Sequence, residues 1–317
     1  MSGPVTEADA PATAAVDHAT TEDGIEILDS REAQVGAIHV RRALPRRAHR
    51  TVRAWCFADH AGPLSVTDAQ RVDIGPHPHM GLQPVTWLLA GELPHRDSLG
   101  SEQAIRPGQL NLMTAGRGVA HAEETVAGYR GEFHGIQLWV AQPNETRHGE
   151  AAFEHHADLP NVELGAADAT VIVGDFADAS SPARRDTQHT GVELTLRPGR
   201  TTVPLRVDYE CALIVFEGAL AVDERVLGPG HLGYLGLDRD ELAVDVREPT
   251  RAILLGGVPF PEPIFMWWNF VGRSADEMDT AYTDWQAADA RFGEVHSELA
   301  RVPAPRPQWV ESGSGVD

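Results

Sequence analysis

The sequence predicts an all-β protein built from two similar barrels in tandem, followed by one short helix. Short apolar runs alternate with turns, and 30 Gly and 22 Pro in 317 residues are typical of a turn-rich β protein. The chain also repeats itself: segment 88–93 is echoed at 215–220, and the Pro-Gly turn at 106–110 is echoed at 228–232. A helix start followed by a helical apolar pattern occurs later, at 274–285.

The two ends of the chain have little apolar surface to bury. Residues 1–25 are mainly Ala, Thr, Pro, Asp and Glu, and the last residues are rich in Pro, Ser and Gly. Such compositions cannot offset the entropy lost on folding, so we expect disordered tails. The expected units are a tail at 1–25, a first barrel at 26–150, a linker at 151–187, a second barrel at 188–258, an aromatic segment with the helix at 259–300, and a tail at 301–317.

The first barrel is predicted from a series of strands and tight turns. Residues 85–89 form a strand candidate that ends at the Ala90-Gly91 turn. Residues 106–109 form a second turn, and 110–113 resemble a short strand after it. Together these segments describe one half of a small antiparallel barrel.

An aromatic run and a helix follow the second barrel. Residues 257–263 contain too much proline for regular structure, and 264–270 are the most aromatic run in the chain. Exposed, this run would promote aggregation, so we expect it to be buried between modules. Ser274 and Glu277 form a capping box, and Met278, Tyr282 and Trp285 follow at helical spacing.

Two short motifs in the first barrel carry candidate metal ligands. His77 and His79 are separated by one residue, and so are His121 and Glu123. A single pair of this kind is usually chance, but two pairs in a β context favour a metal site. Alternate side chains of a strand share a face, so the two pairs can place three imidazoles and one carboxylate around one centre. Such a site has coordination positions left over, unlike a closed structural zinc site.

The internal repeat predicts that the second barrel holds no metal. Aligning the turns of the two modules places Pro204, Arg206, Ala243 and Asp245 at the positions of the four candidate ligands. Only the last could bind a metal. We therefore expect one metal ion per chain, in the first barrel.

These motifs resemble those of the pirin family, in the cupin superfamily. The resemblance is carried by His-Pro-His-Met-Gly-Leu at 77–82, by the highly specific run at 113–123 that contains Thr-Ala-Gly-Arg-Gly, and by Gly-Ile-Gln-Leu-Trp-Val at 135–140. It extends from about residue 38 to about residue 294. It implies a bicupin fold, in which each barrel is a jelly-roll-like double-stranded β-helix.

The resemblance also implies a metal and its ligands. It implies Fe(II) in the N-terminal barrel, held by the residues that match the family's ligands: His77, His79, His121 and Glu123. Ligand type alone leaves Mn, Ni, Cu or Zn open. Met80 and Gln83 stand where the better-known pattern has Arg and Glu, which changes the charge near the pocket mouth.

Three functions are compatible with this site. The first is a dioxygenase: similar pirins include quercetin 2,3-dioxygenases, and a flavonol, enol or catechol substrate would lose its hydroxyl proton to Glu123. The second is an iron- or redox-sensing protein that binds a transcription factor or metabolic enzyme, as some pirins do. The third is an isomerase or lyase that needs Lewis acidity without O2. Oxygen consumption separates the first from the others.

Composition limits the partners and the compartment. The formal charge of −21 argues against direct binding of nucleic acid or of an anionic membrane. The N-terminus has no signal-peptide pattern, and no apolar run is long enough to span a bilayer. Cys56 and Cys211 fall in different barrels, so we expect no disulfide and a reducing, cytoplasmic setting. A small-molecule substrate and a protein partner fit this charge, as do a monomer and a homodimer.

Four further polar residues are candidates for supporting roles. His95 and Asp97 follow the Gly91 turn and could lie at the pocket rim. His134 could line the first barrel, and Gln137 could donate a hydrogen bond in the pocket.

Overall fold

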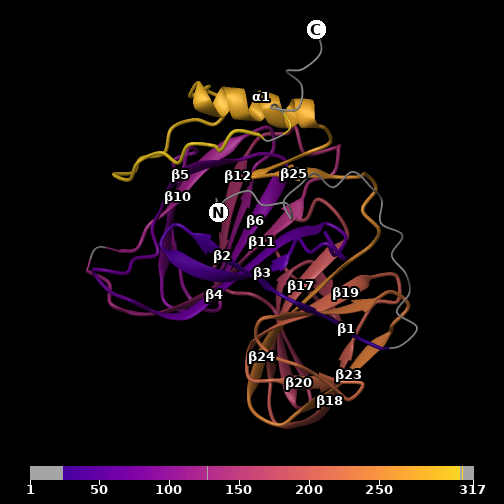
Figure 1. The fold of residues 1–317 in the computed structure, drawn as a ribbon. Coiled ribbons are helices and arrows are strands. Elements are labelled where there is room, and N and C mark those ends of the chain that lie inside the picture. The colour runs from indigo at the N-terminus through magenta and orange to yellow at the C-terminus, as the bar shows by residue number, and fades with distance from the viewer. Residues whose placement is uncertain (1–23, 127, 308, 310–317) are drawn as a thin grey trace.

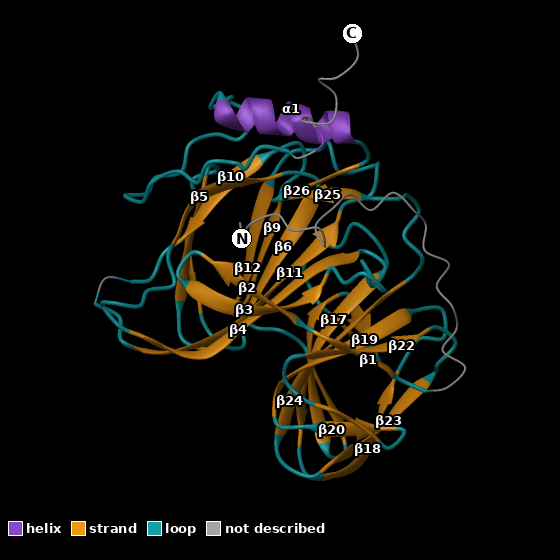
Figure 2. Ribbon diagram, in the orientation of Figure 1, coloured by secondary structure: helices purple, strands orange, loops and turns teal. Residues whose placement is uncertain are grey.

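The computed structural model describes residues 24–126, 128–307 and 309. It consists of two β-barrels, one above the other in Figure 1, with a helical layer on the outer side of the upper barrel. Figure 2 shows that almost all regular structure is strand, with one helix among the described residues. The predicted all-β fold with two tandem barrels is confirmed.

The first barrel is made of two sheets, one of seven strands and one of four. The larger sheet contains, in spatial order, β12 (Ala152–His156), β9 (Leu110–Thr114), β6 (Leu82–Ala90), β11 (Gly131–Ala141), β4 (Trp55–Val66), β3 (Ile38–Leu44) and β2 (Arg31–Val35). The smaller sheet contains β5 (Ile74–His79), β10 (Val119–Glu123), β7 (Leu93–Asp97) and β8 (Glu102–Ile105). The smaller sheet therefore carries both predicted ligand motifs.

The second barrel repeats this plan of seven and four strands. Its larger sheet contains β1 (Glu26–Asp29), β22 (His231–Gly236), β19 (Glu210–Glu217), β24 (Thr250–Gly257), β17 (His189–Leu196), β14 (Ala167–Val173) and β13 (Asn161–Leu164). Its smaller sheet contains β18 (Gly199–Pro204), β23 (Glu241–Val246), β20 (Leu220–Val222) and β21 (Arg225–Leu227). A short hairpin of β15 (Asp175–Phe176) and β16 (Ala179–Ser180) lies beside it. In the spatial order of the two smaller sheets, β18 and β23 of the second barrel take the places of β5 and β10 of the first.

Two expected boundaries differ from the structure. Segment 151–187 is not a linker, because β12 pairs with β9 of the first barrel while β13 and β14 extend the second. At the N-terminus, β1 pairs with β22 of the second barrel instead of joining the first. The unpaired N–H and C=O groups at the edge of a sheet favour pairing with another strand, which can come from a distant part of the chain. Such pairing leaves no signal in the local sequence.

The two barrels pack against each other through their larger sheets. One apolar cluster joins Trp87 and Leu138 of the first barrel to Phe216 and Ile253 of the second. The indole N–H of Trp55 donates to the backbone oxygens of Thr190 and Gly256, both at 3.2 Å. The first barrel, and with it the ligand motifs, is thus held by a continuous interface.

The aromatic segment and the helix cover the outer face of the ligand strands. The hairpin β25 (Phe265–Trp267) and β26 (Phe270–Gly272) and the helix α1 (Ala275–Gln286) share an apolar cluster with Met80 and Ala120. The run is therefore buried as predicted, but between the first barrel and α1 (Figure 1), not between the two barrels. Alternation along β5 and β10 directs these apolar side chains outward and the histidines inward.

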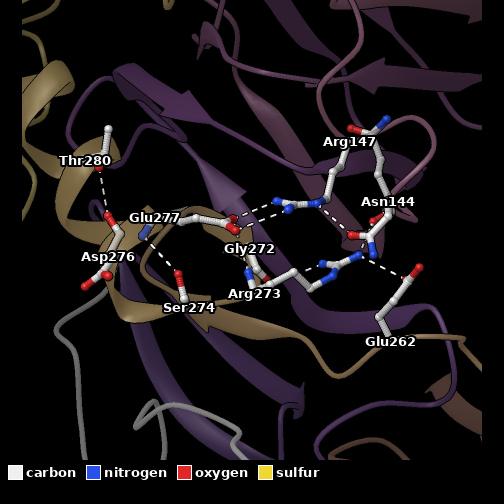
Figure 3. Close-up of polar contacts among 10 residues, drawn as sticks. Asn144, Arg147, Glu262, Gly272, Arg273, Ser274, Asp276, Glu277 and Thr280 are labelled. Atoms are coloured by element: carbon white, nitrogen blue, oxygen red, sulfur yellow. Dashed lines mark hydrogen bonds and ion pairs between the residues drawn. The ribbon is translucent and has the colours of Figure 1, made fainter.

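Only one of the two hydrogen bonds of the predicted capping box is present at the start of α1. Ser274 Oγ accepts a hydrogen bond from the Glu277 N–H at 3.3 Å, as expected. The Glu277 carboxylate does not bond the Ser274 N–H in return; it accepts from the Arg273 N–H at 3.2 Å and from the Arg147 guanidinium at 2.7 and 3.2 Å. Figure 3 shows this network, in which Arg147 follows β11 and ties α1 to the first barrel.

The expected tails are only partly described. The N-terminal prediction concerns residues 1–25, of which 1–23 lie outside the described residues; Ile25 is buried in the second barrel. At the C-terminus, the prediction of disorder is wrong for 301–307. There the Val302 N–H donates to the Pro76 oxygen, and the Trp285 indole N–H donates to the Val302 oxygen. Residues 310–317 are not described.

Two smaller predictions can be compared with the structure. Cys56 and Cys211 are free and buried, one in each barrel, and burial raises the pKa of each thiol to about 12. Among the residues described, α1 is too short and too polar to span a lipid bilayer, and so no helix there could do so.

Candidate metal centre

Strand pairing brings the three predicted histidine ligands together. In the antiparallel pair of β5 and β10, His77 lies opposite His121, and His79 lies opposite Val119. One nitrogen from each of His77, His79 and His121 lies within 4.8 Å of the others. Both strands are buried on this face, so the three imidazoles point into the barrel.

Burial keeps the three imidazoles neutral. Desolvation lowers the pKa of His77, His79 and His121 well below the ordinary value, and the nearby His95 lowers each of them further. Neutral imidazole is the form that binds a metal ion, because the proton must leave the ligand nitrogen. The three imidazoles can therefore bind a divalent ion without first losing a proton.

Hydrogen bonds fix which nitrogen each histidine can offer. His77 Nδ1–H donates to the Gly75 backbone oxygen at 2.9 Å, and its buried Nε2 has no hydrogen-bond partner among the residues that the structure describes. A buried nitrogen lone pair without a donor is unfavourable unless another group binds it. A metal ion at the centre of the three histidines would bind it, so the residues present fit the metal.

His95 and Asp97 fix the tautomer of His121. His95 Nε2 lies 3.1 Å from Asp97 Oδ2, and His95 Nδ1 lies 3.2 Å from His121 Nδ1. Asp97 only accepts, so a neutral His95 donates through Nε2 and accepts the His121 Nδ1 proton. His121 Nε2 is then left with its lone pair, and it lies 3.1 Å from His79 Nε2 at the centre.

Asp97 is itself held by backbone donors. Its Oδ1 accepts from the Leu99 and Ser101 N–H groups, both at 2.9 Å. Burial works to raise the pKa of Asp97, but the hydrogen bonds from His95 and Ser101 outweigh it and lower that pKa. His95 and Asp97 are therefore not rim residues but a buried support behind a ligand.

Glu123 is not a member of the three-histidine group. The register between β5 and β10 shifts after His121, so that Glu123 lies opposite Ile74. Its carboxylate is outside the group of ligand atoms within 4.8 Å of one another. Burial raises its pKa. Its role as the fourth ligand stays a prediction.

A row of buried polar side chains crosses the sheet next to Glu123. Asp59, Gln137 and Thr86 are direct register partners on β4, β11 and β6, so their side chains share one face. With Glu123 and mainly apolar residues they line a cavity of about 20 Å³. Thr86 Oγ1 donates to Gln137 Oε1 at 3.0 Å, which leaves the Gln137 amide N–H groups as donors in the pocket.

The polar row was only partly predictable. Gln137 is expected from the resemblance, whereas Asp59 and Thr86 are isolated polar residues in apolar strands and give no motif. Asp59 is buried in a two-point ion pair with Arg42, at 2.7 and 2.8 Å. The one signal that the sequence gives for Asp59 and Thr86 is a polar residue inside a strand that otherwise buries apolar residues. Burial of such a side chain is unfavourable unless it has a hydrogen-bond partner.

Met80 and Gln83, expected near the pocket mouth, are buried. Met80 packs in the apolar cluster beneath α1. Gln83 Nε2 donates to Thr114 Oγ1 at 3.0 Å. Neither side chain belongs to the histidine cluster.

His134 does not line the first barrel. Its Nε2 lies 2.7 Å from His60 Nε2, and its Nδ1 lies 3.1 Å from the Glu217 carboxylate of the second barrel. Desolvation lowers the pKa of His60 to about 2. His134 thus belongs to the interface between the barrels.

Comparison with known proteins identifies the family. Two family models match the chain: Pirin over residues 37–140, and the Pirin C-terminal cupin domain over residues 191–293. The chain belongs to the pirin family. The first match coincides with the barrel that carries the histidine cluster and the second with the other barrel, so the bicupin fold expected for a pirin is confirmed.

Three known proteins resemble this pirin over most of its length. It is 42% identical over 289 residues to a Pseudomonas aeruginosa protein named as a candidate quercetin 2,3-dioxygenase, covering 90% of this chain and 91% of that protein. It is 35% identical to a pirin-like protein of Caulobacter vibrioides, covering 87% and 98%. The crystal structure of a quercetin 2,3-dioxygenase from Acinetobacter baumannii superposes with a TM-score of 0.87 at 39% identity, covering 90% and 96%.

Proposed function

We propose that this pirin is a dioxygenase dependent on one Fe(II) ion, which opens a flavonol-like or related enol or catechol substrate with O2. The observation that carries the proposal is the set of three neutral imidazoles, of which His77 offers a buried Nε2 with no partner in the described part of the chain. Relatives named for quercetin 2,3-dioxygenase activity support the reaction class. His77, His79 and His121 would hold the ion, with Glu123 as a fourth ligand.

The bound ion would supply Lewis acidity and the redox chemistry that O2 requires. The remaining contributions come from the chain. Glu123 would take the proton of the substrate hydroxyl, because burial gives its carboxylate a raised pKa and hence greater basicity. The amide N–H groups of Gln137 would donate to a substrate oxygen, while His95 and Asp97 hold His121 in the required tautomer.

Oxygen uptake tests the proposal. Protein loaded with Fe(II) under anaerobic conditions is mixed with O2 and quercetin, and His121→Ala is measured beside it. His231→Ala is the matched control, because His231 is a partly exposed histidine of the second barrel. We expect uptake by the wild type and by His231→Ala, but not by His121→Ala.

Failure of uptake would have a clear meaning. If the wild type binds iron stoichiometrically and consumes no O2 with quercetin or with a simple catechol, the dioxygenase proposal is wrong. Recovery of a protein partner that depends on the iron oxidation state would then favour redox sensing instead.

A further inference from the structure

Two of the three clustered histidines, His77 and His79, lie on an edge strand. β5 is the outermost strand of the smaller sheet in the first barrel, and its neighbour in that sheet is β10. An edge strand is held by a ladder of hydrogen bonds on one side only, so it detaches more easily than a central strand. Since His121 is on β10, detachment of β5 would take the metal centre apart.

The free edge of β5 offers hydrogen-bond acceptors but few donors. Pro78, which has no N–H, lies opposite Ala120 of β10 in a pair without backbone hydrogen bonds. The backbone groups of Pro78 and of its alternate neighbours Pro76 and Met80 therefore point away from β10. All three residues have a carbonyl oxygen, but only Met80 has an N–H. A further strand could not form a regular ladder on this edge.

The chain that follows the second barrel supplies donors to this edge. The Val302 N–H donates to the Pro76 oxygen at 2.8 Å, and the Val271 N–H donates to the Met80 oxygen at 2.9 Å. A parallel bridge between Met80 and Phe270 accompanies the second bond. The hairpin β25–β26 and the segment after α1 thus hold β5 near both of its ends (Figure 1).

Both contacts bring backbone against backbone. A Cβ at Gly75 would overlap the Ala300 oxygen, and a Cβ at Gly81 would overlap the Val271 oxygen. The Gly75 oxygen is also the acceptor for His77 Nδ1–H, at 2.9 Å. The segment after α1 therefore packs directly against the backbone that orients one of the clustered histidines.

The segment after α1 is itself tied to the helix. The Trp285 indole N–H donates to the Val302 oxygen at 2.9 Å. The Arg301 guanidinium stacks on the Trp285 ring and donates to the Trp285 backbone oxygen. The hairpin, the helix and this segment share one apolar cluster. We call this unit, residues 265–304, the C-terminal cap.

We propose that the C-terminal cap clamps the metal centre, with the backbone N–H groups of Val271 and Val302 positioning β5 and so the ligands His77 and His79. The metal ion and the docked cap then stabilise each other, because detachment of β5 separates two ligands from the third. This inference rests on the metal site of the proposed function, but not on its reaction with O2.

The rate of metal release tests the role of Val302. Protein is loaded with Fe(II) in the absence of O2, and an excess of a colour-forming chelator collects the released metal. Val302→Pro removes the N–H that bonds Pro76, and loss of one neutral hydrogen bond should speed release roughly two- to tenfold. His296→Pro is the matched control, because His296 is exposed in the same segment and its N–H makes no hydrogen bond within the described part of the chain. Its release rate should equal that of the wild type.

A second variant loosens the same contact in another way. Trp285→Phe removes the N–H that bonds the Val302 oxygen but keeps an aromatic ring in the apolar cluster. It should also speed release roughly two- to tenfold. It takes the place of Val302→Pro if that protein does not fold.

Hydrogen exchange shows whether the metal and the cap are coupled. With free Fe(II) at about 100 times its Kd, amides of β26 and of residues 300–304 should exchange roughly 100-fold more slowly than in metal-free protein, because opening then requires release of the ion. Amides of β19, in the second barrel, should not change. In His121→Ala, Fe(II) should not slow exchange in the cap.

The contrary results are distinct from one another. If the wild type and the folded variants release Fe(II) at equal rates, or if Fe(II) leaves exchange in the cap unchanged, the clamp is wrong. Equal acceleration of exchange in the cap and in β19 of Val302→Pro would show general instability and would also overturn it. Failure of the wild type to bind Fe(II) would overturn the metal centre and the clamp together, whereas Fe(II) binding without O2 uptake overturns only the dioxygenase.

Discussion

His77 and His121 face each other across β5 and β10 as direct register partners, with ring centroids 4.3 Å apart. This pairing is what brings the two ligand motifs, more than forty residues apart along the chain, to a single centre. Each motif by itself places its side chains on one face of a strand. Because β5 pairs with β10, the side chains of both motifs lie on the same face of the smaller sheet.

Removal of one ligand should release the metal without unfolding the protein. His77→Ala should lose most of the bound Fe(II), because only two of the three clustered histidines remain, while the two apolar barrel cores are untouched. Metal content after dialysis and far-UV circular dichroism measure the two effects. Global unfolding of His77→Ala, with His231→Ala folded, would show that the site is structural.

Asp97→Asn should weaken metal binding although Asp97 does not touch the metal site. The asparagine Oδ1 can still accept from the Leu99 and Ser101 N–H groups, but its amide no longer dictates that His95 donates. The tautomer of His121 is then less well defined, and we expect roughly 10- to 100-fold weaker Fe(II) binding. Metal affinity measured by competition with a chelator tests this. An unchanged affinity would mean that His95 orients His121 without the carboxylate.

Gly81→Ala should be far more destabilising than Gly100→Ala. Both glycines have positive φ, +71° and +89°. A Cβ at Gly81 would lie 2.0 Å from the Val271 oxygen, whereas nothing lies within 4 Å at Gly100. We expect about 1–2 kcal/mol for the left-handed backbone alone at Gly100, and a clearly larger loss at Gly81. Urea denaturation compares the two, and equal losses would contradict the close contact.

Loss of the Glu277 carboxylate should loosen α1. Glu277→Gln weakens the contacts with Arg147 and the Arg273 N–H that dock the helix start on the first barrel (Figure 3). A charge-assisted hydrogen bond contributes about 1.5–3 kcal/mol, so amide hydrogen exchange within α1 should accelerate at least about tenfold. Exchange in β19 is the internal reference. Equal acceleration in both would indicate global instead of local opening.

His189 should make the protein less stable in acid. Burial lowers its pKa from 6.5 to about 4, so the unfolded chain binds its proton first as the pH falls. Stability from this group is complete above pH 6.5 and is lost as the pH falls toward 4, by about 1.4 kcal/mol per pH unit. The unfolding free energy of His189→Phe should therefore fall less steeply with acid than that of the wild type. Parallel curves would contradict the neutral buried imidazole.

Several features of the fold and site were predictable because their signals are local. Period-two spacing places His77 with His79 on one face of a strand, and the repeated turns predict two barrels. Ser274 with the apolar spacing after it predicts α1. Each of these inferences depends only on residues close together in the chain.

The remaining features required the tertiary structure, because they depend on which strands pair. β7 lies beside β10, so His95 reaches His121, and the row of Asp59, Gln137 and Thr86 crosses three strands. The pairing of β1 with the second barrel and the register shift between His121 and Glu123 have the same origin. Strand pairing is decided by burial of apolar faces and completion of backbone hydrogen bonds across the whole barrel, and no short segment of sequence contains that information.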